Sequence, residues 1–594
     1  MEKAVTALQV DTFKDIAKRI IKGSIRSAIC LDDVFEEPYM TTEEKKTLNQ
    51  NLEAVGLKLD TDIPKNLYKS FRTKGKCDLD IYNFKTFDES WHPDYMLNNK
   101  DLVILDWELE GKDGYNSTLM ILEEIIESDK VPFVIIYTYK PIADFREISK
   151  NIIQRFNSYS KENIQENKNK LIKQFDEHLS KVSDNKEWES DKSELFFEKP
   201  EIINLLLDFF LFPNLRSKNI ELFYEAIMKE FLIDTKDKVQ KKFKTVCNNV
   251  FGKEPLLALF NISHVFIGSE TINNYKFDRI ETNDIGFKIN NCIITLFSKP
   301  GENNAESIDP ENVFTKFSDL ISSAPHNFIT LLALEMRDRF REDLSKIGNE
   351  ISSIDEKAFF VHLKNYQSRF EDSYKVQFYD FLLKSWINEL NNYNTNLKPE
   401  IFSVIDEYIV NAGLENTKGS DNVVALANLA AILSSTIVHD RFERDNKIRF
   451  GDVFNLTTMS DMDEKIESES FFLSITPHCV CLDECKIDNN FYFIKSESSS
   501  DNFKSGLEKI ETEYYSIIKN ATIFKSVKWG ECKPFTLYIN PNTIDNLNSV
   551  YQNSPIELRY VTTLKENFAQ RIANKAFGYG TAVGIDLPHI RRND

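Results

Sequence analysis

The chain has 594 residues, of which 41% are hydrophobic and 28% charged, proportions typical of soluble globular proteins. This length exceeds what one hydrophobic core serves, so we expect several domains, and only 18 Gly and 17 Pro exclude a collagen-like or wholly disordered chain. The 74 basic and 94 acidic residues leave a net charge of −20, which disfavours polyanionic partners such as nucleic acid or acidic membrane surfaces.

The N-terminal residues do not show the basic and then apolar order of a secretory signal. The longest nearly apolar run, residues 424–438, contains Asn428 and Ser434 and is too short to cross a bilayer. Eight Cys spread over the whole chain are typical of reduced thiols rather than of a disulfide framework. We therefore expect a cytoplasmic protein with no membrane segment.

Residues 1–215 alternate short apolar runs with charged helical stretches, a pattern that predicts an α/β domain with a parallel sheet covered by helices. The expected strands are residues 27–31, 80–87, 101–105, 132–137 and 194–197. Most of these runs lack period-2 alternation, as strands buried on both faces do. The charged helical stretch at 142–192 is longer than one crossover requires, so we interpret it as an insertion.

The remaining chain divides by pattern into two further domains. Residues 216–445 have mainly helical periodicity, most clearly at 326–347, 356–390 and 422–439, with a hairpin expected at 287–297. Residues 446–594 combine short alternating strands with a long helix at 505–519 and a last helix at 562–576, which predicts an α+β domain. In this domain the segments RFGDVF and FFLSITPHCVCL are similar to a small β-barrel-like module of bacterial conflict-system proteins.

Three carboxylates follow expected strands of the first domain. Asp32 and Asp33 come after the strand at 27–31, and Asp106 comes after the strand at 101–105. Because ligands bind outside the carboxyl ends of parallel strands, we expect these side chains to converge at one edge of the sheet. A hard divalent cation offsets their repulsion, so the sequence predicts a Mg²⁺ site formed by these three residues.

Two further residues complete this edge in the prediction. Thr138 ends the strand at 132–137, and Lys199 follows the strand at 194–197, just before Pro200. A hydroxyl and an ammonium group can both contact the oxygens of a phosphoryl group, and Asp106 is the natural carboxylate to accept one. Lys140 also precedes a proline, but it lies two residues after Thr138 and cannot end the next strand.

The order Asp-Asp, Asp, Thr and Lys-Pro resembles the receiver domain of two-component response regulators, over about residues 24–212. Trp107 after the acceptor, Gly114 and the segment LFFEKPEIINLL agree with that family as well. The resemblance implies a flavodoxin-like sheet of five parallel strands and a phosphoryl group accepted on Asp106 from a histidine kinase in a Mg²⁺-dependent reaction. It also implies that Phe196, three residues before the lysine, is a switch aromatic residue.

The sequence departs from the family in its spacing. Extra residues separate Asp33 from Asp106, and about 40 extra residues separate Thr138 from Lys199. Glu110 replaces a proline that is common in the family's loop. Two alternatives therefore stay open: a pseudo-receiver that never carries phosphate and acts as a scaffold, and a phosphatase of the haloacid-dehalogenase type. The second is disfavoured because that family places its nucleophile first and its acidic pair last.

The layout also resembles large receiver-bearing proteins of bacterial anti-phage defence operons, such as Detocs-like systems. That resemblance implies a phosphoacceptor rather than a turnover enzyme, with a histidine kinase and other proteins of the same system as partners and self-association as an open alternative. In the expected α+β domain, four potential zinc ligands lie within eight residues: His478, Cys479, Cys481 and Cys485. Their spacing favours unliganded thiols over a zinc site. The sequence does not identify the kinase or the output of residues 216–594.

Overall fold

The computed structural model divides the chain into two compact units, residues 1–342 with 398–413 and residues 343–397 with 414–594. The described residues are most of 12–156, a few positions between 199 and 229, residues 277–279, most of 286–382, 399–415 and 423–436, and most of 448–578, with short gaps inside these ranges. Each unit is described by itself.

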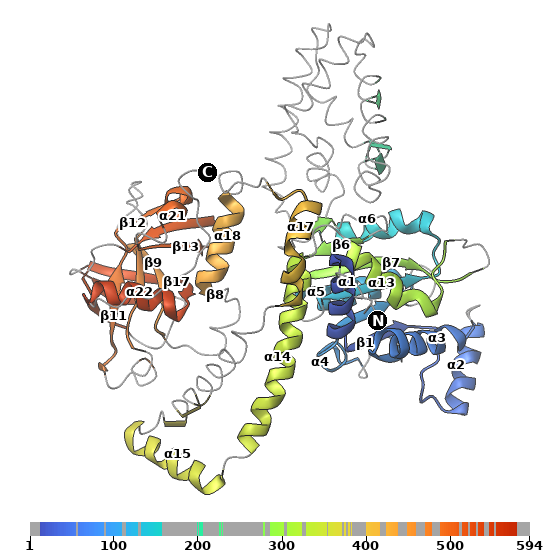
Figure 1. The fold of residues 1–594 in the computed structure, drawn as a ribbon, viewed down its shortest axis with the longest axis horizontal. Helices are drawn as coiled ribbons and strands as arrows, with labels where there is room; N and C mark the ends of the chain where they lie inside the picture. The colour runs from blue at the N-terminus through green and yellow to red at the C-terminus, as the bar shows by residue number, and fades with distance from the viewer. Residues whose placement is uncertain are drawn as a thin grey trace, which may run out of the picture. The chain divides into compact units, whose positions relative to one another are not determined.

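The first unit contains a sheet with helices on both faces (Figure 1). Its strands are β1 (Ser27–Asp32), β2 (Asp78–Asn83), β3 (Leu102–Leu105), β4 (Phe133–Thr138), β5 (Phe277–Arg279), β6 (Gly286–Ile289) and β7 (Cys292–Ser298). Its α-helices are α1 (Phe13–Ser24), α2 (Thr42–Ala54), α3 (Asp62–Ser70), α4 (Pro93–Met96), α5 (Tyr115–Ser128), α6 (Phe145–Arg155), α13 (Val313–Ser323), the first part of α14 (Phe328–Ser352) and α17 (Ile405–Asn411). Shorter helical turns are η1 (Phe71–Gly75), η2 (Ile142–Asp144), η4 (Pro310–Asn312) and η6 (Glu400–Val404).

The strand order of this sheet is β2-β1-β3-β4-β7-β6-β5. The first four pairs in that order are parallel, and the β6 and β5 pairings are antiparallel. Five parallel strands in the order 2-1-3-4-5 are the doubly wound, flavodoxin-like arrangement. The expected α/β domain with a parallel sheet is therefore confirmed, but the sheet is only mostly parallel, because an antiparallel hairpin extends it at one edge.

The fifth parallel strand differs from the expected one. The strand beside β4 is β7, and the two pair in parallel from Phe133↔Ile293 to Thr138↔Ser298. The expected strand at 194–197 lies outside the described residues. The hairpin expected at 287–297 is present as β6 and β7, but it belongs to this sheet and not to a separate helical domain, so the sheet continues beyond the expected boundary at residue 215. Six of the seven buried residues of β7, from Ile293 to Ser298, pair with the whole of β4, so the hairpin completes this sheet.

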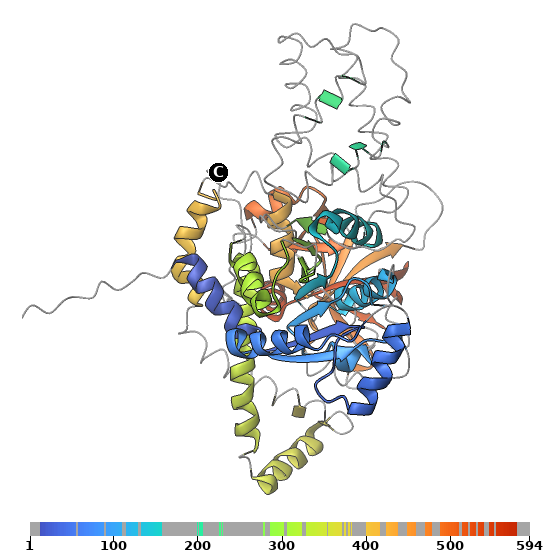
Figure 2. The ribbon, with the colours of Figure 1, turned by 90° about the vertical axis from the view of Figure 1, so that its right-hand side faces the viewer.

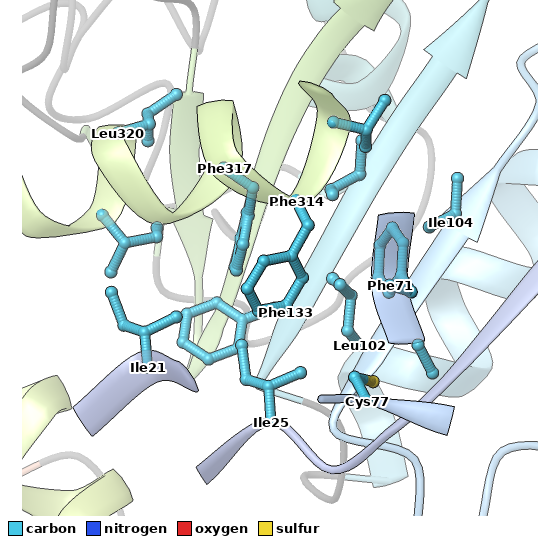
Figure 3. Packing of buried hydrophobic residues seen from close by; sticks show 14 of the residues in the cluster. Ile21, Ile25, Phe71, Cys77, Leu102, Ile104, Phe133, Phe314, Phe317 and Leu320 are labelled. Atoms are coloured by element: carbon cyan, nitrogen blue, oxygen red, sulfur yellow. The ribbon is translucent and has the colours of Figure 1, made fainter. Parts of the chain in front are cut away.

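A large apolar core fills one face of the sheet. Alternate residues of the strands, including Leu102, Ile104 and Phe133, pack there against Phe314 and Phe317 of α13 (Figure 3). The residues between them, such as Val103 and Val134, are also buried and point to the opposite face, as strand geometry requires. Because right-handed crossovers run from β1 to β2 and, in the opposite direction, from β3 to β4, their connecting helices lie on opposite faces, which explains burial on both sides (Figure 2).

At the amino edge of the sheet a buried aspartate binds helix α14. The Asp101 carboxylate accepts hydrogen bonds from the backbone N–H groups of Arg26 and Ser27 at 2.9 and 3.2 Å. Arg341 donates two further hydrogen bonds to it at 3.2 and 2.6 Å, and Arg337 lies 2.9 Å away as an ion-pair partner. This network fastens α14 to the start of β1 and β3.

The second unit is α+β. Its helices are the end of α14, α15 (Glu356–Phe370), α18 (Val423–Ser434), α21 (Phe503–Lys509) and α22 (Glu566–Ala576). Its strands are β8 (Ser435–Thr436), β9 (Asp452–Thr458), β10 (Ser470–Ser474), β11 (Asn490–Lys495), β12 (Ser498–Ser500), β13 (Tyr515–Asn520), β14 (Ile523–Lys528), β15 (Phe535–Tyr538), β16 (Asn546–Tyr551) and β17 (Ser554–Leu564). They form an antiparallel sheet in the order β15-β11-β10-β9-β17-β16, with β8 beside β17, and a smaller sheet in the order β12-β14-β13.

The two end strands of the larger sheet come together. The Ser549 hydroxyl on β16 donates a hydrogen bond to the Tyr538 carbonyl on β15 at 2.9 Å, and Phe535 packs against Tyr551 with ring centroids 4.8 Å apart. A curled sheet gives such contacts, but the expected β-barrel-like module stays a prediction. The long helix expected at 505–519 is wrong: α21 ends at Lys509, and β13 begins at Tyr515 with a run, YSIIKN, rich in β-forming residues.

Within the part of the chain that the structure describes, no helix combines the length and the apolar character that crossing a membrane requires.

Candidate functional site

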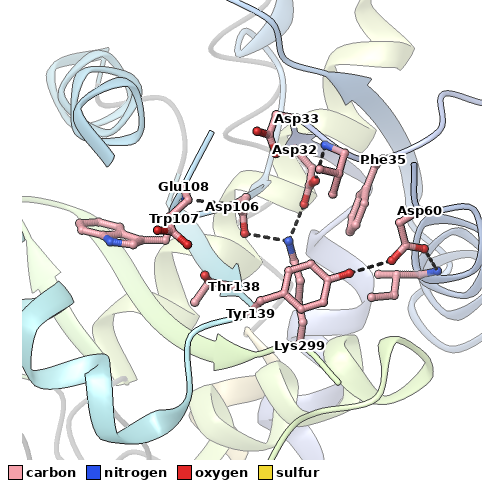
Figure 4. Close-up of polar contacts among 12 residues, drawn as sticks. Asp32, Asp33, Phe35, Asp60, Asp106, Trp107, Glu108, Thr138, Tyr139 and Lys299 are labelled. Atoms are coloured by element: carbon pink, nitrogen blue, oxygen red, sulfur yellow. Dashed lines mark hydrogen bonds and ion pairs between the residues drawn. The ribbon is translucent and has the colours of Figure 1, made fainter. Parts of the chain in front are cut away.

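Four polar side chains lie at the carboxyl edge of the first unit's sheet, each at the end of a different parallel strand. Asp32 is the last residue of β1, Asp106 follows β3, Thr138 ends β4 and Lys299 follows β7 (Figure 4). The strands are in register, with Leu31 opposite Leu105 and Thr138 opposite Ser298. Parallel pairing therefore brings residues that are far apart in sequence to the same rim. Asp32 and Lys299, which form an ion pair there, are 267 positions apart.

Lys299 connects Asp32 and Asp106, two of the three carboxylates expected at this rim; the third is Asp33. Lys299 Nζ donates a hydrogen bond to Asp32 Oδ2 at 2.6 Å and another to Asp106 Oδ1 at 2.7 Å. The side chains of Lys299 and Asp32 are each 1% exposed and that of Asp106 is 8% exposed. The ammonium group thus lies between two buried carboxylates, in a position where a cation is needed.

The lysine at this rim is Lys299, and this corrects the assignment of Lys199. Lys199 lies before a short helical segment, where its carbonyl accepts a hydrogen bond from the Ile202 N–H at 3.0 Å. Both lysines precede a proline and follow an apolar run, so the local sequence does not separate them. The decisive difference is sheet pairing, because the run before Lys299 is the strand beside β4.

Aromatic rings surround the Lys299 ammonium. Its Nζ lies 4.8 Å from the ring centroid of Phe35, 4.7 Å from that of Tyr139 and 5.8 Å from that of Tyr137. Phe35 and Tyr137 are fully buried, whereas Tyr139 is 44% exposed. Cations are attracted to the faces of such rings, so this surround stabilises the charged lysine while it keeps water away. Sequence reasoning missed Phe35 and Tyr139, because nothing in their local pattern distinguishes them from core residues.

The charges of the site do not balance. Burial by itself would lower the pKa of Lys299, but the charges of Asp106 and Asp32 and the hydrogen bonds to both outweigh burial and raise it, so the lysine stays charged. Burial raises the pKa of Asp32 to about 7; Lys299 opposes this, and the charges of Asp106 and Asp33 add to it. One ammonium therefore serves two carboxylates, while the charge of Asp33 acts on Asp32, and the site carries an excess of negative charge.

The remaining oxygens of the site have backbone partners. Asp32 Oδ1 accepts a hydrogen bond from the Val34 N–H at 3.0 Å, and Asp106 Oδ2 accepts one from the Glu108 N–H at 3.1 Å. For the Thr138 hydroxyl, the described residues supply one hydrogen bond, which it accepts from the Lys140 N–H at 3.3 Å. The Thr138 hydroxyl proton is therefore available to a group placed beside Asp106, and Figure 4 shows Thr138 and Asp106 close to one another.

The donor chemistry of this rim fits a hard divalent cation. Asp32, Asp33 and Asp106 supply carboxylate oxygens, and the charges of Asp106 and Asp33 both raise the pKa of Asp32. In the described residues, however, no three His, Cys, Asp or Glu side chains are gathered closely enough to form a metal site. In this arrangement the Lys299 ammonium lies between Asp32 and Asp106 and supplies positive charge there.

Two other predicted features lie wholly or mainly outside the described residues. Phe196 is one of them. Of the His478 to Cys485 cluster, the structure describes only Cys481, which is buried and whose Sγ donates a hydrogen bond to the Thr476 carbonyl at 3.3 Å.

Residues 24–190 match the family model of the response receiver domain. The match covers less than a third of the chain and shows a receiver domain in its N-terminal part. It contains Asp32, Asp33, Asp106 and Thr138 but ends before β7, so Lys299 lies beyond it. Searches of curated proteins and of solved structures found no match.

Proposed function

We propose that this protein is a response-regulator-like signalling protein whose receiver domain accepts a phosphoryl group on Asp106 from a histidine kinase. The single observation that carries the proposal is the contact of Lys299 with both Asp32 and Asp106 at the carboxyl edge of a five-stranded parallel sheet. Together with the receiver match over residues 24–190, it supplies an acceptor carboxylate, acidic neighbours and a cation at one rim.

The side chains have distinct parts in the proposed reaction. An oxygen of Asp106 attacks the phosphorus of the donor, the bond from phosphorus to the donor's nitrogen or oxygen breaks, and the donor leaves with the electron pair of that bond. Lys299 lies within reach of an Asp106 oxygen, so it can neutralise charge on the phosphoryl group. Thr138 can donate its hydroxyl proton to a phosphoryl oxygen.

Mg²⁺ would be held by Asp32, Asp33 and Asp106 and, when bound, would neutralise charge on the acidic rim and on the donor phosphate. For Lys299 the proposal implies a change of partner, because the ammonium that now bridges Asp32 and Asp106 would turn toward the phosphoryl group. A buried lysine enclosed by aromatic rings can make this change without becoming exposed to water.

The output of the second unit, residues 343–397 with 414–594, would pass through protein partners, since the net charge of −20 disfavours a nucleic-acid output. We also propose that the kinase belongs to a bacterial anti-phage defence system of the Detocs-like type. That part of the proposal is supported by the resemblance in layout alone, a large chain with a receiver and a long additional region.

The test is incubation of the full chain with Mg²⁺ and acetyl phosphate, followed by a phosphate-affinity gel. The expected result is a shifted band in the wild type that disappears in Asp106→Asn and when Mg²⁺ is removed with a chelator. Release of phosphate from many small esters would instead indicate a phosphatase. No modification by acetyl phosphate or by a cognate histidine kinase would contradict the proposal and leave the scaffold alternative.

A further inference from the structure

The loop that follows β4 is held from two sides at the mouth of the site. Tyr139 Oη donates a hydrogen bond to Asp60 Oδ2 at 2.8 Å. The next residue, Lys140, forms an ion pair with Glu108 at 3.0 Å, which ties the loop to the chain that follows Asp106. Thr138, Tyr139 and Lys140 are consecutive, so any movement of this loop changes both the lining and the cover of the site.

Asp60 is a rigid anchor for Tyr139. Its N–H donates to the Val34 carbonyl at 2.8 Å, and its carbonyl accepts from the Glu36 N–H at 2.9 Å, which joins it to Phe35 as a parallel bridge. Its Oδ1 accepts hydrogen bonds from the N–H groups of Asp62 and Ile63, each at 3.0 Å, at the start of α3. The Oδ2 atom is left for Tyr139, so Tyr139 is the part of the contact that can move.

Tyr139 packs against the ammonium group that would contact a phosphoryl group on Asp106. Its ring centroid lies 4.7 Å from Lys299 Nζ, which is itself 2.7 Å from Asp106 Oδ1. As whole residues, Tyr139 is 44% exposed and Asp106 is 6% exposed, and Figure 4 shows the Lys299 ammonium between the Tyr139 ring and Asp106. Burial and the hydrogen bond to Asp60 both raise the pKa of Tyr139, so it keeps its proton and remains a donor at neutral pH.

We propose that the Tyr139–Asp60 contact is a latch that sets which phosphoryl donors reach Asp106, with Tyr139 as the specificity-determining residue. The inference rests on the proposed phosphoryl transfer. With the latch closed, the phosphorus of a donor with a bulky leaving group does not approach Asp106. With the latch open, the Tyr139 ring moves off Lys299 and makes room for the donor and for the phosphoryl group.

The geometry distinguishes donors by size. Phosphoramidate transfers its phosphoryl group with ammonia as the leaving group, and phosphoimidazole does so with imidazole, the chemistry of a phosphohistidine. In both cases the P–N bond breaks, its electron pair stays with nitrogen, which takes a proton from water, and an oxygen–phosphorus bond to Asp106 forms. The latch predicts that the closed site accepts the small donor more readily than the large one.

The experiment compares wild type with Tyr139→Phe, which keeps the ring but removes the hydrogen bond, and with Tyr139→Ala, which removes both. Tyr95→Phe is the matched control, because Tyr95 is 85% exposed and lies on α4. Access to Asp106 is measured independently of phosphorylation, by modification with a water-soluble carbodiimide and an amine and mass spectrometry of the peptide that contains Asp106. Rates with phosphoramidate and phosphoimidazole are measured on the same proteins.

The latch predicts that Tyr139→Phe raises the rate of carbodiimide modification at Asp106 by at least about tenfold, the factor that corresponds to the lower end of the range for loss of a hydrogen bond to a charged group. It also predicts that Tyr139→Ala raises the rate with phosphoimidazole more than the rate with phosphoramidate, and that Tyr95→Phe changes neither. Wild-type modification rates and an unchanged donor ratio in both Tyr139 variants would overturn the latch. Faster carbodiimide modification without aspartyl phosphate in any protein would support the latch as a cover and contradict the proposed function.

Discussion

The two ends of strand β3 carry buried aspartates in opposite electrostatic situations. At the amino end, Asp101 has two arginines and two backbone N–H groups as partners, so its charge is more than satisfied. At the carboxyl end, Asp106 shares a single ammonium, Lys299, with Asp32. The Asp101 network holds helix α14 in place. At Asp106 and Asp32, one ammonium does not neutralise both carboxylates, so negative charge remains that can attract a cation. The difference separates an aspartate that stabilises the fold from one that is available for chemistry.

The largest expected effect is at the amino end. Asp101→Ala leaves Arg337 and Arg341 without their shared carboxylate and leaves two backbone N–H groups without an acceptor. Removing one partner of a buried pair costs roughly 3 to 5 kcal/mol, so we expect a loss of about that size in the free energy of unfolding of the first unit. Urea unfolding measures it, and a loss below about 1 kcal/mol would show that the network contributes little to stability.

Removal of the lysine at the carboxyl end is expected to have the next largest effect. Lys299→Met leaves two buried carboxylates facing each other, but Asp32 can take up a proton, so we expect a loss of about 2 to 3 kcal/mol, smaller than at Asp101. The control is Lys199→Met. Lys199 is partly exposed, so we expect this substitution to change the free energy of unfolding by no more than about 0.5 kcal/mol. Equal effects of the two substitutions would contradict the placement of Lys299 in the site.

Asp106→Asn is expected to act in the opposite direction to Asp101→Ala. It removes one of two negative charges around Lys299 and keeps a side chain of the same shape, so we expect the free energy of unfolding to stay the same or to rise by up to about 1 kcal/mol. Thermal unfolding of the variant beside the wild type checks this. A fall of 2 kcal/mol or more would mean that Asp106, like Asp101, is held mainly for stability.

The smallest effect is a dependence on pH that only the carboxyl end should show. The pKa of Asp32 is raised to about 7, so between its ordinary value and about 7 the folded chain keeps a proton that the unfolded chain has lost. Its contribution to stability is therefore present at low pH and is lost as the pH rises through about 7. The wild type should lose stability relative to Asp32→Asn between pH 5 and pH 8 in urea unfolding. A difference that stays constant or grows over this interval would contradict the raised pKa.

Much of the first unit's fold could be predicted from sequence, because runs such as the one before Asp106 are apolar without alternation and end in carboxylates. The fifth strand could not be assigned in this way. Two apolar runs end in Lys-Pro, at Lys199 and at Lys299, and only pairing across the sheet distinguishes them, which is a contact far apart in sequence. The hairpin before Lys299 was visible as a pattern, but its membership in the sheet depends on β4 having a free edge.

The cover of the site was equally hidden from sequence. Tyr139 and Asp60 are 79 positions apart, and their contact depends on how the segment between β1 and α3 folds back over Phe35. In the second unit, the helix expected at 505–519 fails for a different reason. Its first part is helical, but the β-forming run that follows pairs with β14, and tertiary pairing overrides the helical period.

The central claim is that Asp106 is phosphorylated in a site completed by Lys299, and one measurement tests it most directly. Wild type, Lys299→Ala and Lys199→Ala are incubated with acetyl phosphate and Mg²⁺, and the aspartyl phosphate is reduced with borohydride and located by mass spectrometry. We predict modification at Asp106 in the wild type and in Lys199→Ala, and its loss in Lys299→Ala. Modification at another residue, or its loss in Lys199→Ala with Lys299→Ala unaffected, would contradict the account.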